Sequence, residues 1–374
     1  MPTILMAVEL MAVDAIPASG AKSRPIRPIR PMEVTERMDL ATSRPGPAIR
    51  ATSSVVTPAD HWDHVLARWA YRRDRHRVAP GLNALGSPTP DSPVLITANY
   101  TLSFDALRSA LPGTDAYILV LETYGINVWC AAGKGSFGTA ELVRRIEATG
   151  LREVVRHRAL ILPQLGAPGV SAHEVKAATG FRVEYGPVRA ADLPEYLKTR
   201  RATPEMRRIR FGLADRLTLI PVELVSVALP VLALVVVSIL LGWPAPALGG
   251  IASILAGVAL FPMLLPWLPT HDFSSKGLIL GFVVALPFAA ATYFGRSPEP
   301  ELARVALSLA CLLSLPAVTA YLALNFTGAT TFTSRSGVQR EIRSYIPPIA
   351  GLFAVGIVLA AGAMVGQVVA RGGI

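Results

Sequence analysis

The residues best suited to chemistry lie in the segment YGINVWCAAGKGSFGTAELVRRIE, residues 124–147. It places Cys130 and Lys134 among small residues, directly after an apolar run typical of a buried strand. Small neighbours would let a large flat ligand approach the backbone, while nearby N–H groups and Lys134 would favour the thiolate form of Cys130. A thiolate in a strand-to-helix connection could ligate a metal. The alternative is a small buried cysteine that only packs.

The glycines of this segment allow a second interpretation. Gly133, Gly135 and Gly138 form a GxGxxG pattern after a strand, which is the context of a dinucleotide site. However, the connection over residues 123–138 is much longer than the tight first turn of such a unit, and the next strand ends without the acid that binds ribose. A Walker A phosphate loop is excluded, because Lys134 is followed by glycine rather than by Ser or Thr.

The surrounding sequence predicts the elements that position this segment. Between residues 60 and 198, strand-like runs alternate with the helical stretches SFDALRSAL, TAELVRRIEATG and SAHEVKAATG. This alternation predicts a Rossmann-like α/β domain with a mostly parallel sheet, which binds ligands at the carboxyl ends of its strands. Thr97, Asn99, Gln164 and Gly169 follow or end such runs and are therefore candidate binding residues. The four strand-like runs are VLITANY (94–100), AYILVLE (116–122), ALILPQL (159–165) and FRVEYGP (181–187).

Charge and hydropathy divide the chain into a soluble and a membrane part. The 374 residues are 52% hydrophobic, with a mean hydropathy of +0.44. Residues 1–216 contain 29 basic and 21 acidic residues, whereas residues 217–374 contain only 7 and 5. The second part therefore reads as an all-α transmembrane domain of about five helices. The expected spans are residues 219–241, 245–268, 276–294, 302–324 and 345–370.

The remaining segments complete the predicted organisation. Residues 1–59 are rich in Pro, Arg, Ser and Thr and are expected to be disordered, or to precede a true start at Met32 or Met38. A signal peptide is disfavoured, since no basic residue precedes the apolar stretch and two acids interrupt it. Residues 199–216 read as a basic linker, which would bind anionic lipid or, alternatively, an acidic partner.

Basic residues also predict the orientation in a membrane. They gather before the first span and in the loops on the same side, at Lys276, Arg335, Arg340 and Arg343. The positive-inside rule then places the soluble domain on the cytoplasmic side of the inner membrane. No ionisable residue lies near the centre of a span, so an anchor is favoured over a transporter.

Two cysteines, Cys130 and Cys311, exclude a disulfide scaffold, a four-cysteine iron–sulfur cluster and a zinc ribbon within this sequence. Cys311 lies in the fourth expected span and is most simply a small packing residue. Any redox chemistry must come from a cofactor or a partner. No nucleic-acid partner is expected.

NVWCAAGK, residues 127–134, resembles the cap-helix signature of the mercury-methylation corrinoid proteins, the HgcA family. The resemblance continues through VLITANYTLSFD, LILPQLGAPGVSAHEVKAATGF, VEYGPVRAADLPEYL and the five expected spans. The soluble part is also similar to the corrinoid domain of the acetyl-CoA-pathway corrinoid iron–sulfur protein, whose Cys-bound cluster this sequence has too few cysteines to hold. The DxHxxG signature of a histidine cobalt ligand is absent, and DHWDH at residues 60–64 does not supply it.

The resemblance implies a cobalamin-type corrinoid, with Cys130 as the lower axial ligand of its cobalt. It implies that the side chains before Cys130 fix the cap helix, that the small residues after it give clearance for the ring, and that Lys134 biases the thiolate or binds a cofactor amide. The implied cofactor contacts beside Cys130 are Asn127, Val128, Trp129, Ala131, Ala132, Gly133, Lys134 and Ala190.

The resemblance further implies a membrane-anchored methyltransferase that passes a methyl group to Hg(II) and forms methylmercury. An electron-donating thiolate below cobalt suits delivery of the methyl group to an electrophile. The implied partners are a small ferredoxin with two [4Fe–4S] clusters and a methyltetrahydrofolate-linked methyl donor. One alternative is a corrinoid methyl carrier of one-carbon metabolism with a different acceptor, and another is a membrane-tethered nucleotide-binding module.

Overall fold

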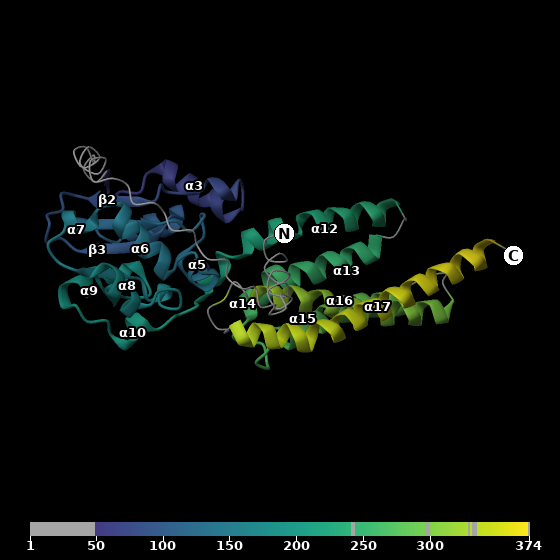
Figure 1. Ribbon diagram of the computed structural model, residues 1–374. Coiled ribbons are helices and arrows are strands. Elements are labelled where there is room, and N and C mark those ends of the chain that lie inside the picture. Colours follow the sequence, from purple (N-terminus) through teal and green to yellow (C-terminus); the bar gives the residue numbers. More distant parts are fainter. Residues whose placement is uncertain (1–48, 241–243, 296–299, 328–329, 331–334, 373–374) are drawn as a thin grey trace, which may run out of the picture. The chain divides into compact units, whose positions relative to one another are not determined.

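The computed structural model describes residues 49–240, 244–295, 300–327, 330 and 335–372 (Figure 1). The described chain forms an α/β unit that ends at Ile209 and a helical unit that begins at Arg210. Residues 1–48, including the two alternative starts and most of the expected disordered extension, lie outside the described residues.

The α/β unit is built on one six-stranded sheet with the order β1-β2-β4-β3-β5-β6. The four strands expected from the sequence are present, and β3 pairs in parallel with both β4 and β5, as β5 does with β6. The sheet is nevertheless mixed, because β2 runs antiparallel to β4. The strands are β1 Arg50–Thr52, β2 Gly81–Leu85, β3 Val94–Ala98, β4 Ala116–Leu121, β5 Ala159–Leu162 and β6 Arg182–Tyr185.

Two strands were not predicted, and the first corrects the expected N-terminal boundary. Residues 50–52 form β1, parallel to β2, and a helix already begins at Pro58, so the folded unit starts before residue 60. Strand β2, GLNAL, shows little alternation because its centre is the buried polar Asn83. The Asn83 amide donates to the carbonyl of Ile118 on β4 at 3.5 Å, a pairing that no local pattern reveals.

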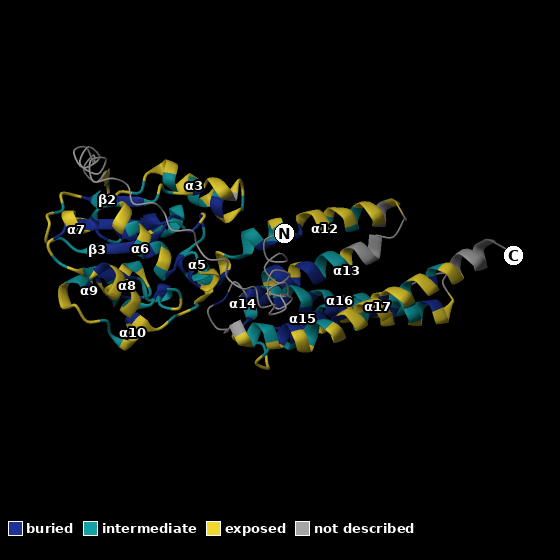
Figure 2. Ribbon diagram, viewed as in Figure 1, coloured by how far each residue is buried: buried dark blue, intermediate teal, exposed yellow. Residues whose placement is uncertain are grey.

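Helices cover both faces of the sheet, whose central strands are buried throughout (Figure 2). Alternate strand residues point to opposite sides. Ile96, Leu119 and Leu160 join a core with α5, α6 and α8, whereas Leu95, Ile118 and Ile161 join one with α4 and α9. The helices of this unit are α3 Pro58–Arg68, α4 Thr101–Ser109, α5 Val128–Lys134, α6 Thr139–Ala148, α7 Leu151–Val154, α8 Ala172–Thr179, α9 Leu193–Thr199 and α10 Pro204–Arg207, with short 3₁₀ turns η2 Arg73–Arg75, η3 Gln164–Gly166 and η4 Ala190–Asp192.

Long apolar helices make up the second unit. Figure 1 shows α15, α16 and α17 running alongside one another, and neighbours in this series pack together. Small residues allow the close approach: a Cβ on Gly277 of α15 would lie 2.7 Å from Ala320 Cα of α16. The elements are α11 Leu213–Leu217, α12 Ile220–Leu240, α13 Pro244–Leu255, a π-helical turn η5 Ala256–Leu260, α14 Phe261–Leu264, α15 Phe273–Phe294, α16 Glu301–Phe326 and α17 Arg335–Gly372.

Four helices of the described chain are long and apolar enough to cross a membrane, one fewer than the sequence suggested. The second expected span is instead a shorter apolar helix, 248–264, interrupted by the π-helical turn. Lys276, Arg340 and Arg343 lie within α15 and α17 rather than in loops.

The expected linker, residues 199–216, is likewise corrected. Its first half belongs to the α/β unit, where Met206 is buried and its carbonyl accepts from the Val188 N–H at 2.8 Å. Its end belongs to the helical unit, where the buried Arg216 donates to the carbonyls of Pro262 and Met263 at 2.9 and 2.8 Å. Arg216 therefore satisfies carbonyls near the end of α14 instead of facing lipid headgroups.

Candidate functional site

Helix α5 carries Cys130, and both of its ends are defined by the sequence. Asn127 Oδ1 accepts a hydrogen bond from the Cys130 N–H at 2.9 Å, which satisfies one of the unpaired donors of the first turn. At the other end Gly135 has a φ of 84°, the left-handed conformation that favours glycine and ends helices. Because Gly133 lies inside α5 and Gly135 ends it, the GxGxxG glycines form a helix terminus and not the turn of a dinucleotide site.

The two faces of α5 have different surroundings. Val128, Ala131 and Ala132 are buried in the core beneath the helix, at the i, i+3, i+4 spacing of one helical face. The small Ala131 and Ala132 let α5 pack closely on the domain, and the expected cofactor contacts of these three residues stay a prediction. Cys130 and Trp129 are half-buried, and Gly133 and Lys134 are exposed, so these four form the open face of α5.

The connection between β5 and α8 packs against α5. Gly169 is the closest point: a Cβ added there would lie 2.2 Å from the Phe137 carbonyl oxygen and 3.0 Å from Ala132 Cα. Gly166 is similarly close to the Phe137 ring, which is fully buried. Gly169 therefore has a packing role that sets the position of α5, and the ligand contact expected there stays a prediction.

Replacing Gly169 with alanine should therefore displace α5. The atoms in the way belong to backbone and cannot swing aside, so we expect a loss of about 1–3 kcal/mol in unfolding free energy. Urea-dependent proteolysis of the full chain in detergent, read on fragments of the α/β unit, measures this loss. Gly133→Ala is the matched control, because its Cβ would meet no atom within 4 Å and the change should stabilise α5 by about 0.5–1 kcal/mol. Equal stability of the Gly169→Ala and Gly133→Ala variants would contradict the packing role of Gly169.

Asn99 organises the loop that leads into α5. Its Oδ1 accepts from the Thr123 N–H at 3.1 Å, the Thr123 hydroxyl at 2.8 Å and the Gly125 N–H at 3.0 Å. Its amide nitrogen donates to Glu122 Oε1 at 2.7 Å. Asn99 is 1% exposed and both ends of its amide are hydrogen-bonded, so it positions the loop; the ligand contact expected at Asn99 stays a prediction.

Glu141 of α6 holds the start of the same loop. Its Oε1 accepts from the Glu122 N–H at 2.8 Å, and its carboxylate pairs with Arg145 at 2.8 Å and with Arg144. Burial alone would raise the pKa of Glu141, but the backbone N–H and the two guanidinium groups outweigh it and lower the pKa below its ordinary value of 4.5. The ionised form is thus favoured in the folded state.

This shift gives the loop an acid sensitivity. Since the folded pKa is lowered, the contribution of Glu141 is fully present above its unfolded pKa and is lost as the pH falls through the folded value. The difference in urea midpoint between the native chain and Glu141→Gln should therefore shrink on acidification below about pH 4.5. A difference that stays constant from neutral to acid pH would show that the carboxylate charge has no such role.

Thr97 and Ala190 lie on the other face of the sheet. Thr97 shares its strand face with Leu95, which belongs to the core beneath α4 and α9, and Ala190 packs against that same core. The structure therefore brings Gln164 and Gly169 next to α5 but does not bring Thr97 or Ala190 onto its face. The sequence could not show on which face of the sheet these residues lie. The carboxyl ends of parallel strands share one edge, but their side chains point to either face.

One unsatisfied group marks the surroundings of α5. Gln164 lies in η3, which packs against α5, and its Oε1 is buried without a hydrogen-bond partner among the described residues. An unpaired buried amide oxygen costs about 1–3 kcal/mol. A ligand with an N–H donor would remove this cost.

The histidines of DHWDH do not form a metal site. His64 Nε2 lies 2.7 Å from Asp105 Oδ2, and His61 is exposed. In the part of the chain that the structure describes, no three His, Cys, Asp or Glu side chains gather in a way that could hold a metal ion. The motif instead attaches α3 to α4.

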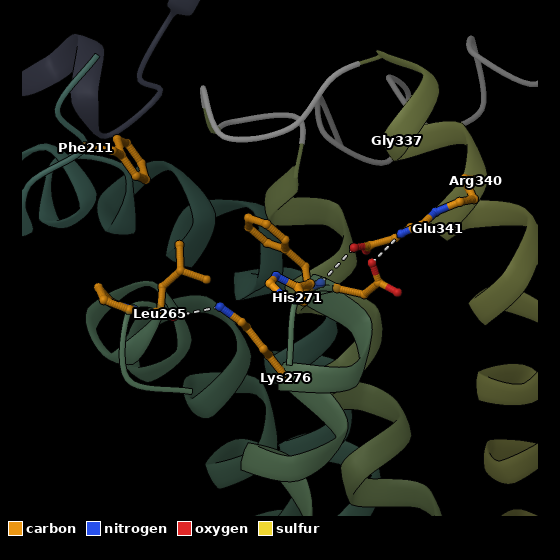
Figure 3. Close-up of a pocket in the computed structure, with 10 residues that line it drawn as sticks. Phe211, Leu265, His271, Lys276, Gly337, Arg340 and Glu341 are labelled. Atoms are coloured by element: carbon orange, nitrogen blue, oxygen red, sulfur yellow. Dashed lines mark hydrogen bonds and ion pairs between the residues drawn. The ribbon is translucent and has the colours of Figure 1, made fainter. Parts of the chain in front are cut away.

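A second polar site, which the sequence did not reveal, lies where α15 and α17 begin (Figure 3). A cavity of about 470 Å³ is lined there by Lys276, Arg340 and the buried Glu341. The Glu341 carboxylate accepts from the Phe273 N–H at 2.8 Å and so caps α15, while the Lys276 ammonium donates to the Leu265 carbonyl at 3.0 Å. These contacts account for charged residues within helices of spanning length.

Known proteins resemble the α/β unit. Residues 60–197 match the family described as CO dehydrogenase/acetyl-CoA synthase delta subunit. The chain is 36% identical over 129 residues to the acetyl-CoA decarbonylase/synthase complex subunit gamma of Methanopyrus kandleri, covering 34% of this chain and 27% of that protein. It is 26% identical over 160 residues to the corrinoid/iron-sulfur protein large subunit of Moorella thermoacetica, covering 40% and 35%.

The subunit gamma of Archaeoglobus fulgidus gives a similar result, with 35% identity over 124 residues, or 33% of this chain and 26% of that protein. The chain thus spans about a quarter to a third of the length of these relatives. The expected relation of the α/β unit to corrinoid proteins of the acetyl-CoA pathway is confirmed.

Proposed function

We propose that this chain is a membrane-attached corrinoid methyl carrier of one-carbon metabolism, in which the Cys130 thiolate ligates cobalt. One observation carries the proposal. Cys130 lies on the open face of a helix whose opposite face is embedded in the core, next to the carboxyl ends of parallel strands. Ligands of α/β sheets bind at that edge.

The residues around α5 fit a corrinoid. Gly133 leaves space above the helix, since a Cβ there would meet nothing within 4 Å. The unpaired Gln164 Oε1 suits one of the many amide N–H donors at the periphery of a corrin ring. When bound, the corrinoid would supply a cobalt atom that can carry a methyl group.

The chain's own groups would stabilise the thiolate form of Cys130. Asn127 fixes the first turn of α5 through the Cys130 N–H, and the N–H groups of that turn carry partial positive charge. Lys134 lies one turn further on the same face and adds a full positive charge. Both effects favour a thiolate over a thiol at neutral pH.

Hg(II) is our proposed methyl acceptor, with methylmercury as the product. A thiolate is a strongly donating ligand that would make the methyl group electron-rich, which suits an electrophilic metal ion. Two histidines of the α/β unit, His64 and His76, are held by Asp105 and Asp63, so neither of these imidazoles is available as an alternative cobalt ligand. The resemblance of NVWCAAGK to the mercury-methylation family supports the same acceptor.

The proposed partners follow from what the chain lacks. Its two cysteines cannot supply the four thiolates of an iron–sulfur cluster, so we propose a small ferredoxin with two [4Fe–4S] clusters as the electron donor. The methyl donor is proposed to be linked to methyltetrahydrofolate. The basic residues near the helix ends support a cytoplasmic location of the α/β unit at the inner membrane.

Corrinoid binding can be tested by filling the open face. Gly133→Leu should leave the packing of α5 intact but occupy the space above it, so the full chain reconstituted anaerobically with cobalamin should lose the corrinoid absorption bands. Gly133→Ala, a much smaller change at the same position, should retain most of them. Native binding by the leucine variant would place the cofactor elsewhere, and no corrinoid bands in the native chain would overturn the proposal.

The acceptor requires a separate measurement. Mercury methylation should appear in an anaerobic host that expresses this chain together with a two-cluster ferredoxin, and not with either protein alone. Methyl transfer by the corrinoid-loaded pair without formation of methylmercury would favour a carrier with a different acceptor.

A further inference from the structure

Helix α3 turns its polar face toward the domain and its apolar face outward, which is the reverse of an ordinary surface helix. Its inner face is polar: Asp60 pairs with Arg108 at 2.8 Å, His64 with Asp105 at 2.7 Å, and Asp63 with His76 at 2.7 Å. Of its eleven residues only Ala67 is a buried hydrophobic one. Amphipathic helices of globular domains normally bury their apolar stripe.

The outer face of α3 and the residue after it is aromatic. Trp62, Val65 and Trp69 are 63%, 42% and 49% exposed. Spacings of three and four residues place them within a sector of about 60° on the helix. Tyr71, 51% exposed, continues the surface, and Figure 2 shows the exposed turns of α3. These four residues are the aromatic face of α3; exposed apolar surfaces of this kind mark interaction sites.

The charge around the aromatic face is positive. Arg68 and Arg72 are exposed and adjacent in sequence to Trp69 and Tyr71, and Arg75 is exposed in the following turn. The Arg72 guanidinium lies 5.2 Å from the centre of the Tyr71 ring. Asp74 is also exposed, but Asp60 and Asp63 are turned inward and bound by cationic or hydrogen-bonding partners. The exposed side of α3 and the residues that follow it therefore carry aromatic and cationic side chains together.

From this combination we infer that the aromatic face of α3 binds the surface of an anionic lipid bilayer. Trp and Tyr favour the boundary between headgroups and acyl chains, and each nearby Arg adds electrostatic attraction to anionic lipid. The same chain carries four helices of spanning length, the first beginning at Leu213, only a few residues after the α/β unit ends. A bilayer is thus always present at high effective concentration, which is not true of a soluble partner.

The contact surface is formed before it meets lipid. The capping box of Thr57 and Asp60 starts α3, and the ion pairs to α4 hold it in place, so binding need not order the helix. The inference does not depend on the cofactor or on the methyl acceptor.

Tryptophan fluorescence of the full chain in nanodiscs tests this inference. The contribution of Trp62 and Trp69 is obtained by subtracting the spectrum of a Trp62→Phe, Trp69→Phe variant. In discs of phosphatidylcholine and phosphatidylglycerol, brominated acyl chains should remove most of this contribution, while aqueous iodide should quench it little. The double variant Arg68→Glu, Arg72→Glu should lose the bromine quenching, whereas the control Arg156→Glu, Lys176→Glu, which also reverses two exposed charges, should keep it.

Three results would overturn the inference. Strong iodide quenching without bromine quenching would show that the face stays in water, open to a soluble partner. Shielding from iodide that is independent of lipid composition, without bromine quenching, would show that the chain itself covers the face. Shielding that increases with protein concentration would indicate a second copy of the chain.

Discussion

Replacing Cys130 with alanine is expected to abolish methyl transfer while the protein still accumulates. Cys130 is half-buried and is not among the buried core residues of the α/β unit, so the unit should still fold, but under the proposed function the change removes the protein ligand of cobalt. Losing groups that merely support a metal ligand costs about 10- to 100-fold in activity, so loss of the ligand itself should exceed this. Methylmercury formed by the anaerobic host, normalised to the amount of protein in the membrane, measures the effect.

Cys311→Ala is the matched control. Cys311 lies in α16 and packs in the helical unit, where the same change should leave activity near that of the native chain. Native activity in the Cys130→Ala strain would remove Cys130 from the chemistry. If neither cysteine matters, the metal is held without a thiolate from this sequence.

A second large effect is expected from Arg108→Met, this time on stability. The Arg108 guanidinium is almost fully buried and donates to Asp105 at 2.6 Å, to Asp60 at 2.8 Å and to the Ser53 carbonyl at 2.8 Å. Its loss leaves the buried Asp105 carboxylate without a guanidinium partner and with only the hydrogen bond to His64 among these side-chain contacts. Removing one member of a buried ion pair costs about 3–5 kcal/mol. The urea midpoint of the α/β unit in the full chain should fall accordingly.

Two further variants test whether the loss of stability arises because the Arg108–Asp105 ion pair is buried. Arg156→Met breaks an ion pair with Asp91 in which both side chains are mostly exposed, and should cost less than about 1 kcal/mol. Adding Asp105→Leu to Arg108→Met should restore part of the lost stability, because no unpaired charge would stay buried. Similar losses from Arg108→Met and Arg156→Met would refute the argument.

The same network also explains why the folded unit begins earlier than the sequence suggested. Arg108 binds carbonyls of residues 53 and 55, and hydrogen bonding from the Thr57 N–H, together with the pairing to Arg108, holds the pKa of Asp60 below its ordinary value. Residues rich in Ser, Thr and Pro thus become ordered through a partner about 50 positions away in the chain. Composition describes a segment alone and does not contain that partner.

The sequence by itself determined the features that depend on local pattern. Strands β3 to β6 follow from their apolar runs, α6 and α8 from their amphipathic period and closing glycines, and the helical unit from its hydropathy. It also singled out Cys130, through a motif of adjacent residues. Even the burial of Val128, Ala131 and Ala132 was present as an i, i+3, i+4 spacing once the segment is taken as a helix.

Only the tertiary structure decided which candidate residues meet. Gly169 and Asn99 became positioning residues, and Thr97 and Ala190 were assigned to the far face of the sheet, because the face and the neighbours of a residue depend on chain segments distant in sequence. The inward-facing carboxylates of α3 and the unpaired Gln164 oxygen have the same origin. Hydrogen bonds and packing act between atoms that folding brings together. A local sequence pattern contains one residue of such a contact and does not show which distant residue is the other.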